Sequence, residues 1–287
     1  MQAPFTGRMP QAETSMTHVI ITGGSSGIGL AIASIYAGRG ARLSLIARSA
    51  EILKRAQDEL SSKSATAGDI RIETADVARE EEIIAAIHRC EAAFGPCDIL
   101  VTSAGVVEPG RFDELGSAAF RRQMETNFSG TVHAVRAVYA GMKQRGHGKI
   151  MMISSGAGLL GIYGYSAYCA SKFALHGFAQ ALRSEARAHG IDVSICFPPD
   201  TQTPQFQREL AFRPPEAAAV MGTVSPWPAE AVARKIVYGI ERGRFEVYFG
   251  MTLFLLGRFG PTVRPLLNWW FDRAIARSSG GVSKGGR

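Results

Sequence analysis

Three side chains in the second half of the sequence have the types and spacing for acid–base chemistry. Tyr168 and Lys172 stand at positions i and i+4 of a predicted helix, so they share one face. A free tyrosine titrates near ~10, and a fixed cation beside it favours the phenolate and lowers that pKa. Ser155 follows an apolar predicted strand, and its hydroxyl can bond the carbonyl oxygen that Tyr168 protonates. These residues predict proton transfer at a carbonyl or hydroxyl group, with an ordinary helix-surface pair as the alternative.

A glycine-rich turn near the start of the chain predicts a site for the phosphates of a nucleotide. The turn follows an apolar strand and leads into a helix that we expect to begin near Gly27. Glycines let the backbone turn sharply and approach a pyrophosphate, which the free N–H groups of a helix N-terminus stabilise. The predicted cofactor-binding residues of this turn are Gly23, Ser25, Ser26, Gly27, Ile28 and Gly29.

The residue after the second predicted strand indicates which dinucleotide binds. Arg48 stands there, and no acidic residue follows before Glu51. An acidic residue would accept from a ribose 2′-hydroxyl, whereas an arginine can neutralise a 2′-phosphate. Arg48 therefore favours NADP(H), a solvated arginine being the alternative. Asp76 and Val77 follow the third strand and are predicted near the adenine, although Asp76 could equally cap the next helix.

The elements that must position these residues alternate between short apolar runs and longer amphipathic stretches, such as residues 80–94. Strands separated by helix-length connections form a parallel sheet with helices on both faces, so the sequence predicts an α/β fold. The alternation stops near residue 249, where a C-terminal appendage of different character follows. The predicted strands are residues 18–22, 42–47, 70–75, 98–102, 149–154, 191–197 and 245–249.

Together these residues resemble the short-chain dehydrogenase/reductase family, over roughly residues 17–250. The resemblance implies a Rossmann-type doubly wound parallel sheet of about seven strands. It also implies the catalytic set Asn127, Ser155, Tyr168 and Lys172, in which Asn127 kinks a long helix and binds a water that relays protons to Lys172. Tyr168 and Lys172 also contact the cofactor, Lys172 through the nicotinamide ribose. Further cofactor-binding residues implied by the resemblance are Ser103, Ala104, Gly105, Pro198, Thr201 and Thr203.

The sequence is also similar to the subgroup of this family that acts on 3-ketosphinganine. The similarity lies in Pro198-Pro199-Asp200-Thr201, in the run from Leu160 to Tyr168, in the glycine turn and in Arg48. It implies NADPH-dependent reduction of the 3-keto group to give sphinganine in sphingolipid synthesis. The subgroup usually has a lysine where this chain has Ile52, and Lys54 is expected to take its place.

Two other functions remain open from the sequence. One is a reductase or dehydrogenase that acts on another lipid, a steroid or a small ketone or alcohol, because the catalytic residues recognise only a carbonyl and a hydride. The other is a non-catalytic nucleotide-binding regulator, because a fold does not fix a function. The presence of Ser155, Tyr168 and Lys172 argues against the regulator.

The region after the last catalytic motif predicts a lipid-facing surface. Residues 203–227 are expected to form an apolar substrate lid, with an ordinary loop packed on the core as the alternative, and residues 251–287 an apolar and basic appendage. The uncharged run 247–257 is too short to span a bilayer, and Gly257, Gly260, Pro261 and Pro265 are expected to break any regular helix. The paired tryptophans near Arg273 and Arg277 favour an interfacial membrane contact through residues 247–277. A dimerisation patch and a flap over the substrate channel are the alternatives.

Charge and composition limit the classes of ligand and partner that the protein is expected to bind. The net charge is +7, and residues 247–287 carry six cations against a single acid, so the body is nearly neutral. This placement argues against nucleic-acid binding. No His/Cys cluster has metal-ligand spacing, so no metal is expected. Residues 1–16 are predicted to be a disordered extension without the apolar core of a signal peptide, which predicts a cytoplasmic protein, or one peripheral to the cytoplasmic membrane face. A long-chain lipid ketone is the expected substrate, and the family resemblance implies a homodimer or homotetramer.

Overall fold

The computed structural model describes residues 17–63, 70–221 and 225–279. The predicted disordered extension, residues 1–16, lies outside the described residues, as do residues 280–287 of the predicted appendage.

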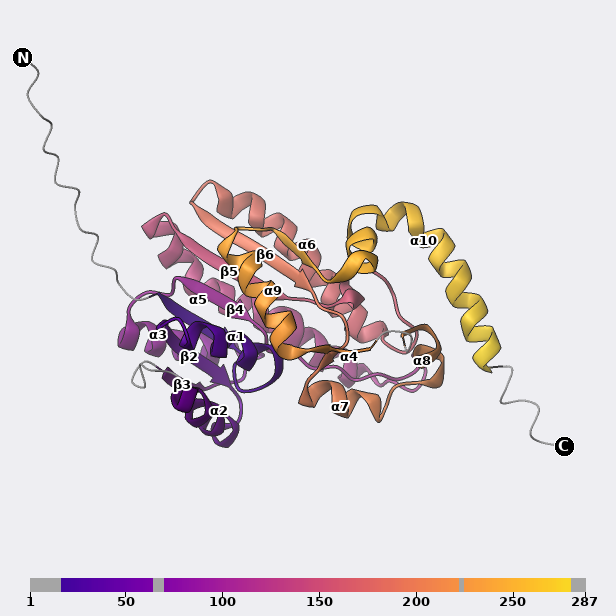
Figure 1. The fold of residues 1–287 in the computed structure, drawn as a ribbon, viewed down its shortest axis with the longest axis horizontal. Helices are drawn as coiled ribbons and strands as arrows, with labels where there is room; N and C mark the ends of the chain where they lie inside the picture. The colour runs from indigo at the N-terminus through magenta and orange to yellow at the C-terminus, as the bar shows by residue number, and fades with distance from the viewer. Residues whose placement is uncertain (1–16, 64–69, 222–224, 280–287) are drawn as a thin grey trace, which may run out of the picture.

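A single parallel sheet forms the centre of the molecule (Figure 1). Among the described residues, seven strands pair in the order β3-β2-β1-β4-β5-β6-β9, and every pairing is parallel. This order is doubly wound and confirms the predicted fold class. The predicted strand ends differ from the observed ones by at most one residue. The strands are β1 (His18–Thr22), β2 (Arg42–Ala47), β3 (Ile70–Thr74), β4 (Ile99–Thr102), β5 (Gly148–Ile153), β6 (Ile191–Phe197) and β9 (Glu246–Tyr248).

Helices cover both faces of the sheet, because successive side chains of a strand point to opposite sides. Val19 and Ile21 of β1 belong to one buried cluster, and Ile20 belongs to the other. The first cluster includes side chains of α1 (Gly27–Ala37), α2 (Ala50–Lys63) and α9 (Ala229–Glu241). The second includes side chains of α3 (Glu80–Phe94), α5 (Gly130–Arg145) and α6 (Ser166–Arg187). Since all strands run the same way, their carboxyl ends meet at one edge of the sheet, where nucleotides bind in such folds.

The described residues of the segment predicted as a lid contain two short helices and end in a short strand, which pairs with another strand just before the segment. These are β7 (Thr201–Gln202), α7 (Pro204–Leu210), α8 (Pro215–Met221) and β8 (Trp227–Pro228). Thr203 caps α7, since its hydroxyl accepts a hydrogen bond from the backbone N–H of Phe206 at 3.1 Å, and Pro204 occupies the first turn. Figure 1 shows α7 and α8 on the same side of the molecule as the C-terminal helix.

The C-terminal segment corrects one prediction. Helix α10 (Gly250–Ser279) runs through all four positions that were expected to break it. A proline removes one backbone hydrogen bond and so can bend a helix without ending it, and Figure 1 shows that α10 bends strongly along its length. Within the described residues, no helix combines the length and the apolar character needed to cross a membrane.

Candidate active site

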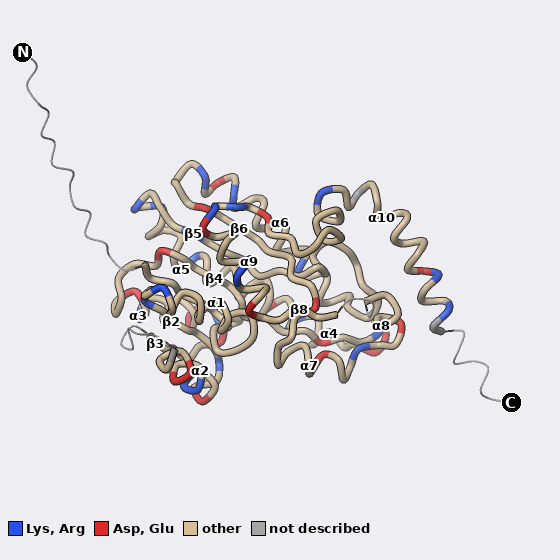
Figure 2. Tube along the Cα trace, in the orientation of Figure 1, with Lys and Arg blue, Asp and Glu red and all other residues tan. Residues whose placement is uncertain are grey.

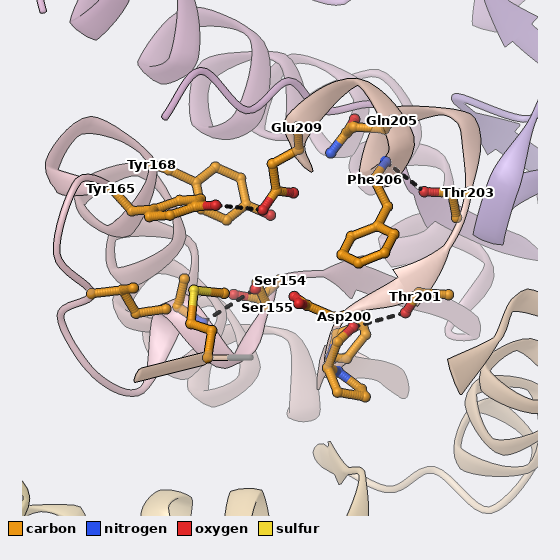
Figure 3. A pocket seen from close by; sticks show the side chains of 15 residues that line it. Ser154, Ser155, Tyr165, Tyr168, Asp200, Thr201, Thr203, Gln205, Phe206 and Glu209 are labelled. Carbon is orange, nitrogen blue, oxygen red and sulfur yellow. Dashed lines mark hydrogen bonds between the residues drawn. The ribbon is translucent and has the colours of Figure 1, made fainter. Parts of the chain in front are cut away.

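The predicted acid–base residues come together at the carboxyl end of β5. Ser155 lies two residues after the end of β5 and caps the turn Gly156–Gly158, where its hydroxyl accepts from the N–H of Ala157 at 3.2 Å. Tyr168 lies in the first turn of α6, where the nearby Ser155 side chain acts to lower the pKa of its phenol. Figure 3 shows both side chains in the wall of one cavity, which we call the catalytic pocket.

Lys172 lies one helical turn beyond Tyr168, beneath the catalytic pocket. Its side chain is 5% exposed, and its Nζ donates to the carbonyl of Ile153 at 3.1 Å. The same Nζ lies 5.5 Å from the centre of the Tyr168 ring. Burial disfavours the ammonium and lowers the pKa of Lys172 to about 8. This lysine can therefore gain or lose a proton near neutral pH.

The pKa of Tyr168 shifts in the direction opposite to the sequence prediction. Burial raises it most, the negative charge of Glu209 raises it further, and the hydrogen bond from Ser155 lowers it only in part. Lys172 donates its hydrogen bond to the backbone carbonyl of Ile153 rather than to the phenol, whereas the charge of Glu209 acts on the buried tyrosine from another element. Tyr168 is thus protonated at neutral pH.

Asn127 lies in the π-helical turn Met124–Ser129, which interrupts the long helix between α4 (Ser117–Gln123) and α5. Its fully buried amide accepts from the N–H of Val106 at 2.7 Å and donates to the hydroxyl of Ser171 at 2.9 Å. A side chain on Gly105 would come within 3.3 Å of Asn127 Oδ1 and 3.7 Å of Lys172 Nζ. Asn127 and Lys172 therefore approach the same glycine, as expected for two members of one site. Ser171 was not singled out by the sequence.

A second cavity, of about 580 Å³, runs along the carboxyl edge of the sheet. We call it the nucleotide cleft, because twelve of the residues predicted to bind a cofactor line it. They are Gly23, Ser25, Ser26, Gly27, Ile28, Arg48, Asp76, Val77, Ser103, Ala104, Gly105 and Thr203. Residues from five separate segments of the chain are thus brought together as the fold class predicts.

The other predicted cofactor residues lie beside this cleft rather than along it. Pro198, Thr201 and Tyr168 line the catalytic pocket, which adjoins the cleft at Thr203 and Gln205. Gly29 packs against the carbonyl of Gly23, where a side chain would collide with the backbone. Gly29 therefore shapes the turn. Asp76 does not cap α3, whose N-cap is Arg79, but its carboxylate accepts from the N–H of Ala78 at 3.0 Å and holds the turn.

The glycine turn fits a dinucleotide. Gly23 has a φ of +69° and Gly27 a φ of +56°, a region that side chains disfavour. A side chain on Gly23 would come within 2.6 Å of the backbone of Ala104. The side chain of Ser26, at the N-cap of α1, makes no capping bond. The first N–H groups of α1 thus face an open cleft, as anion binding at a helix N-terminus requires.

Helix α7 adds cleft residues that the sequence did not indicate. Gln205 and Arg208 line the cleft, and Arg208 is a second cation in the wall that holds Arg48. Ile52 also lines it, whereas Lys54 instead forms an ion pair with Asp58 at 2.8 Å on the surface of α2. The expected replacement by Lys54 is therefore not supported. The sequence does not indicate that Arg208 lies near Arg48, because α7 and β2 are far apart in sequence and come together only in the folded chain.

A charged network borders the catalytic pocket on the lid side. Arg213, whose side chain is 6% exposed, pairs with Asp200 at 3.0 Å and with Glu209 at 2.6 Å. The hydroxyl of Tyr165 donates to Glu209 at 2.6 Å, and Figure 3 shows the Glu209 carboxylate beside the two tyrosines. Two carboxylates face one guanidinium here, so the network carries net negative charge. In the described part of the chain, no group of three or more His, Cys, Asp or Glu side chains is placed to hold a metal ion.

A third cavity, of about 440 Å³, adjoins the catalytic pocket on its other side. We call it the apolar cavity, since most of its lining is aliphatic or aromatic. Ser155, Pro198, Asp200 and Met221 line both cavities. Ser155 and Tyr168 therefore lie between the nucleotide cleft and an apolar space.

Comparisons with known proteins agree with this geometry. A family model described as short chain dehydrogenase matches residues 17–213. A 3-ketodihydrosphingosine reductase of Bos taurus is 37% identical over 258 residues, which cover 89% of this chain and 77% of that protein. A 3-dehydrosphinganine reductase of Danio rerio is also 37% identical, over 83% of this chain and 73% of its own.

Solved structures have the same architecture. A short-chain dehydrogenase from Streptomyces avermitilis superposes with a TM-score of 0.74 at 27% identity, over 92% of this chain and 99% of the other. A levodione reductase superposes with a TM-score of 0.75 at 24% identity, over 81% and 95%, which shows the shared fold. From the family match, the relatives and the arrangement of its residues, the chain belongs to the short-chain dehydrogenase family.

Proposed function

We propose that the protein reduces the 3-keto group of 3-ketosphinganine to sphinganine with NADPH. One observation carries the proposal: Ser155 and Tyr168 lie between a nucleotide cleft and an apolar cavity, so a carbonyl on a long hydrocarbon can meet a dinucleotide there. The names of the relatives from cattle and zebrafish support this particular ketone.

The nucleotide cleft has the residues to hold NADPH. The glycine turn and the N-terminus of α1 suit the pyrophosphate, and Arg48 suits the 2′-phosphate. Bound NADPH supplies the hydride that reduces the carbonyl carbon.

The chain's own residues handle the oxygen of the carbonyl group. Tyr168 donates its hydroxyl proton to that oxygen as negative charge develops on it, and its raised pKa keeps the proton in place until then. The hydroxyl of Ser155 donates a hydrogen bond to the same oxygen and stabilises its charge. Lys172, with a pKa of about 8, returns a proton to Tyr168, and Asn127 keeps the path to Lys172 ordered.

The first test is NADPH oxidation across a panel of ketones. We expect the highest kcat/KM with 3-ketosphinganine, and little turnover of a steroid ketone or a short ketone. Preference for the steroid or the short ketone would replace the proposed substrate, and binding of NADPH without turnover of any ketone would favour the regulator.

The second test is Tyr168→Phe, which removes the proton donor and keeps the ring. Loss of one acid–base group typically costs about 10²–10⁴-fold in kcat. NADPH binding, measured by fluorescence titration, should stay unchanged. A variant that kept near-wild-type reduction would refute the role of Tyr168.

We also propose that the outer face of α10 contacts a membrane surface. This face contains Met251, Phe259, Leu266 and Trp269, which are 51–69% exposed. The guanidinium of Arg273 lies 4.0 Å from the centre of the Trp269 ring, and Figure 2 shows charged residues near the far end of α10. Aromatic and aliphatic side chains flanked by cations suit the boundary between lipid headgroups and acyl chains.

Co-sedimentation with vesicles of zwitterionic and anionic phospholipid tests this contact. The triple variant Met251→Ser, Phe259→Ser, Leu266→Ser should lose most binding, whereas Phe112→Ser, at a residue 76% exposed elsewhere, should not. Unchanged co-sedimentation of the triple variant would exclude the membrane contact. A lower mass in solution for the same variant would instead identify this face as a subunit interface.

A further inference from the structure

The apolar cavity is built by segments that are distant in the sequence. The turn after β5 and the loop after β6 form its inner wall, and α8 and α10 form its outer wall. The side chains that matter most for its shape are Leu160, Met221, Trp227, Leu253, Trp270 and Phe271. Such a lining offers few hydrogen bonds, so it favours hydrocarbon over a polar group.

This cavity begins at the reacting groups. Ser155 lines it. The next residue, Gly156, also lines it and has no side chain that would separate Ser155 from α10. A side chain on Gly156 would come within 3.1 Å of Leu253 Cδ2. Leu253 therefore lies directly over the backbone beside Ser155. A molecule with its carbonyl at Ser155 and Tyr168 can extend its hydrocarbon under α10 without crossing a polar wall.

The bend of α10 encloses the cavity from two sides. Leu253 and Leu256 line it from the part of α10 before the bend, and Leu267, Trp270 and Phe271 line it from the part after. The first part is fixed to the sheet, because Gly257 packs directly on the Tyr248 ring, where any side chain would collide. The Tyr248 ring in turn stacks on Phe197 of β6, with ring centres 5.2 Å apart. A straight helix anchored at this point would not place both parts on one cavity.

We propose that the apolar cavity binds the alkyl chain of the substrate, and that α10 and Met221 set the chain length that the enzyme accepts. The proposal rests on the proposed function, and it assigns α10 a part in the substrate site. The inner face of α10 holds the alkyl chain, while the face of α10 proposed to meet the membrane points outward.

A series of 2-amino-3-ketones with increasing alkyl chains tests the proposal, with kcat/KM measured at saturating NADPH. Each methylene that enters the cavity should raise kcat/KM by up to about fourfold, until the cavity is full. Met221→Trp and Leu253→Trp fill the cavity, so the rise should stop at shorter chains. NADPH binding, measured by fluorescence titration, should stay as in the wild type, which shows that the variants are folded.

Matched control variants place the same bulk outside the cavity. Ala219→Trp lies on the exposed side of α8, and Leu255→Trp lies on α10 at a residue that is 42% exposed. Neither residue lines the cavity, so both variants should keep the wild-type dependence on chain length. If all four variants give the wild-type profile, the cavity does not hold the chain.

A second series, of plain long-chain ketones without the amino group, separates this proposal from the proposed function. Turnover of the plain ketones but not of 3-ketosphinganine, with the shorter cut-off in Met221→Trp and Leu253→Trp, would support the alkyl site and refute the proposed substrate. Turnover of 3-ketosphinganine with the wild-type dependence on chain length in both variants would support the proposed substrate and refute the alkyl site. Activity that rises with chain length only when vesicles are present would assign the chain preference to the membrane and refute the alkyl site.

Discussion

Glu209 links the charge of the lid to the chemistry of Tyr168. Because the proposed mechanism needs the protonated tyrosine, kcat/KM should fall as the pH rises through its pKa. Burial raises that pKa most and the negative charge of Glu209 raises it further, so Glu209→Gln should lower it and move the alkaline limb of the profile to lower pH. The amide still accepts from Tyr165, which preserves the local packing.

A pH series of kcat/KM measures this shift. Glu185→Gln is the matched control, since residue 185 is exposed on the same helix as Tyr168 and lies about 25 Å along its axis. An alkaline limb that stays in place in Glu209→Gln would show that this carboxylate does not act on the catalytic tyrosine.

Arg48 should decide between the two dinucleotides. It lines the nucleotide cleft and is exposed, so its guanidinium is free to bind a 2′-phosphate. Arg48→Ala should lower kcat/KM for NADPH about tenfold and leave that for NADH nearly unchanged. Arg55→Ala, an exposed arginine of α2 that pairs with Glu51, should change neither value. If the ratio of kcat/KM for NADPH to kcat/KM for NADH is the same before and after Arg48→Ala, Arg208 of α7 becomes the candidate for binding the 2′-phosphate.

Single site residues are predictable from the sequence where they belong to a short motif, but not where the lid segment places them in the site. Tyr168 and Lys172 share one helix, and the glycine turn is continuous, so local spacing is enough to find them. Arg208 and Glu209 reach the site only through the fold of α7 against the body. For the same reason, the direction of the Tyr168 pKa shift could not be predicted from its neighbour four residues away.

Strand β1 contains a buried histidine that makes the free energy of unfolding depend on pH below neutrality. His18 is 1% exposed, and its ring nitrogens lie 2.7 Å from the carbonyl of Gly95 and 2.9 Å from the hydroxyl of Ser44. Burial is the main cause that lowers its pKa. The unfolded chain therefore binds an extra proton below about pH 6.5, and the free energy of unfolding should decrease as the pH falls, by at most about 1.4 kcal/mol per unit from this group.

Urea unfolding at several pH values tests the role of His18. His18→Asn should have a weaker pH dependence below neutrality than the wild type, even if its stability at neutral pH is lower. His133→Asn on α5 serves as the control, because its ring is partly exposed and lies outside the sheet. Parallel curves for His18→Asn and the wild type would contradict the prediction.

Strands were predictable here and α10 was not, for a physical reason. A strand buried on both faces reads as a nearly continuous apolar run, so β1 was predicted with its observed ends. In α10, glycine and proline indicate a break by local preference alone. Gly257 instead packs on Tyr248, a close tertiary contact that only a residue without a side chain allows, and this contact was not visible in the sequence.

The contact between Gly257 and the Tyr248 ring holds α10 against the sheet and so affects the whole molecule. Gly257→Ala should force α10 away from Tyr248, since the added methyl group collides with the ring. We expect faster proteolysis of α10 and lower kcat/KM for long-chain ketones, with short ketones reduced nearly as before. Gly177→Ala on α6 meets open space and is the control. Unchanged proteolysis of Gly257→Ala would mean that α10 is held in place by other contacts.

The strong bend of α10, with one face over the cavity and the other exposed, has a kinetic consequence. A ketone dissolved in a bilayer would reach Ser155 by lateral movement along the helix, without passing through bulk water. The rate should then follow the two-dimensional density of the ketone among the lipids rather than its total concentration. Adding inert phospholipid at constant ketone should slow the enzyme, a surface-dilution behaviour that no water-soluble substrate of this fold would give.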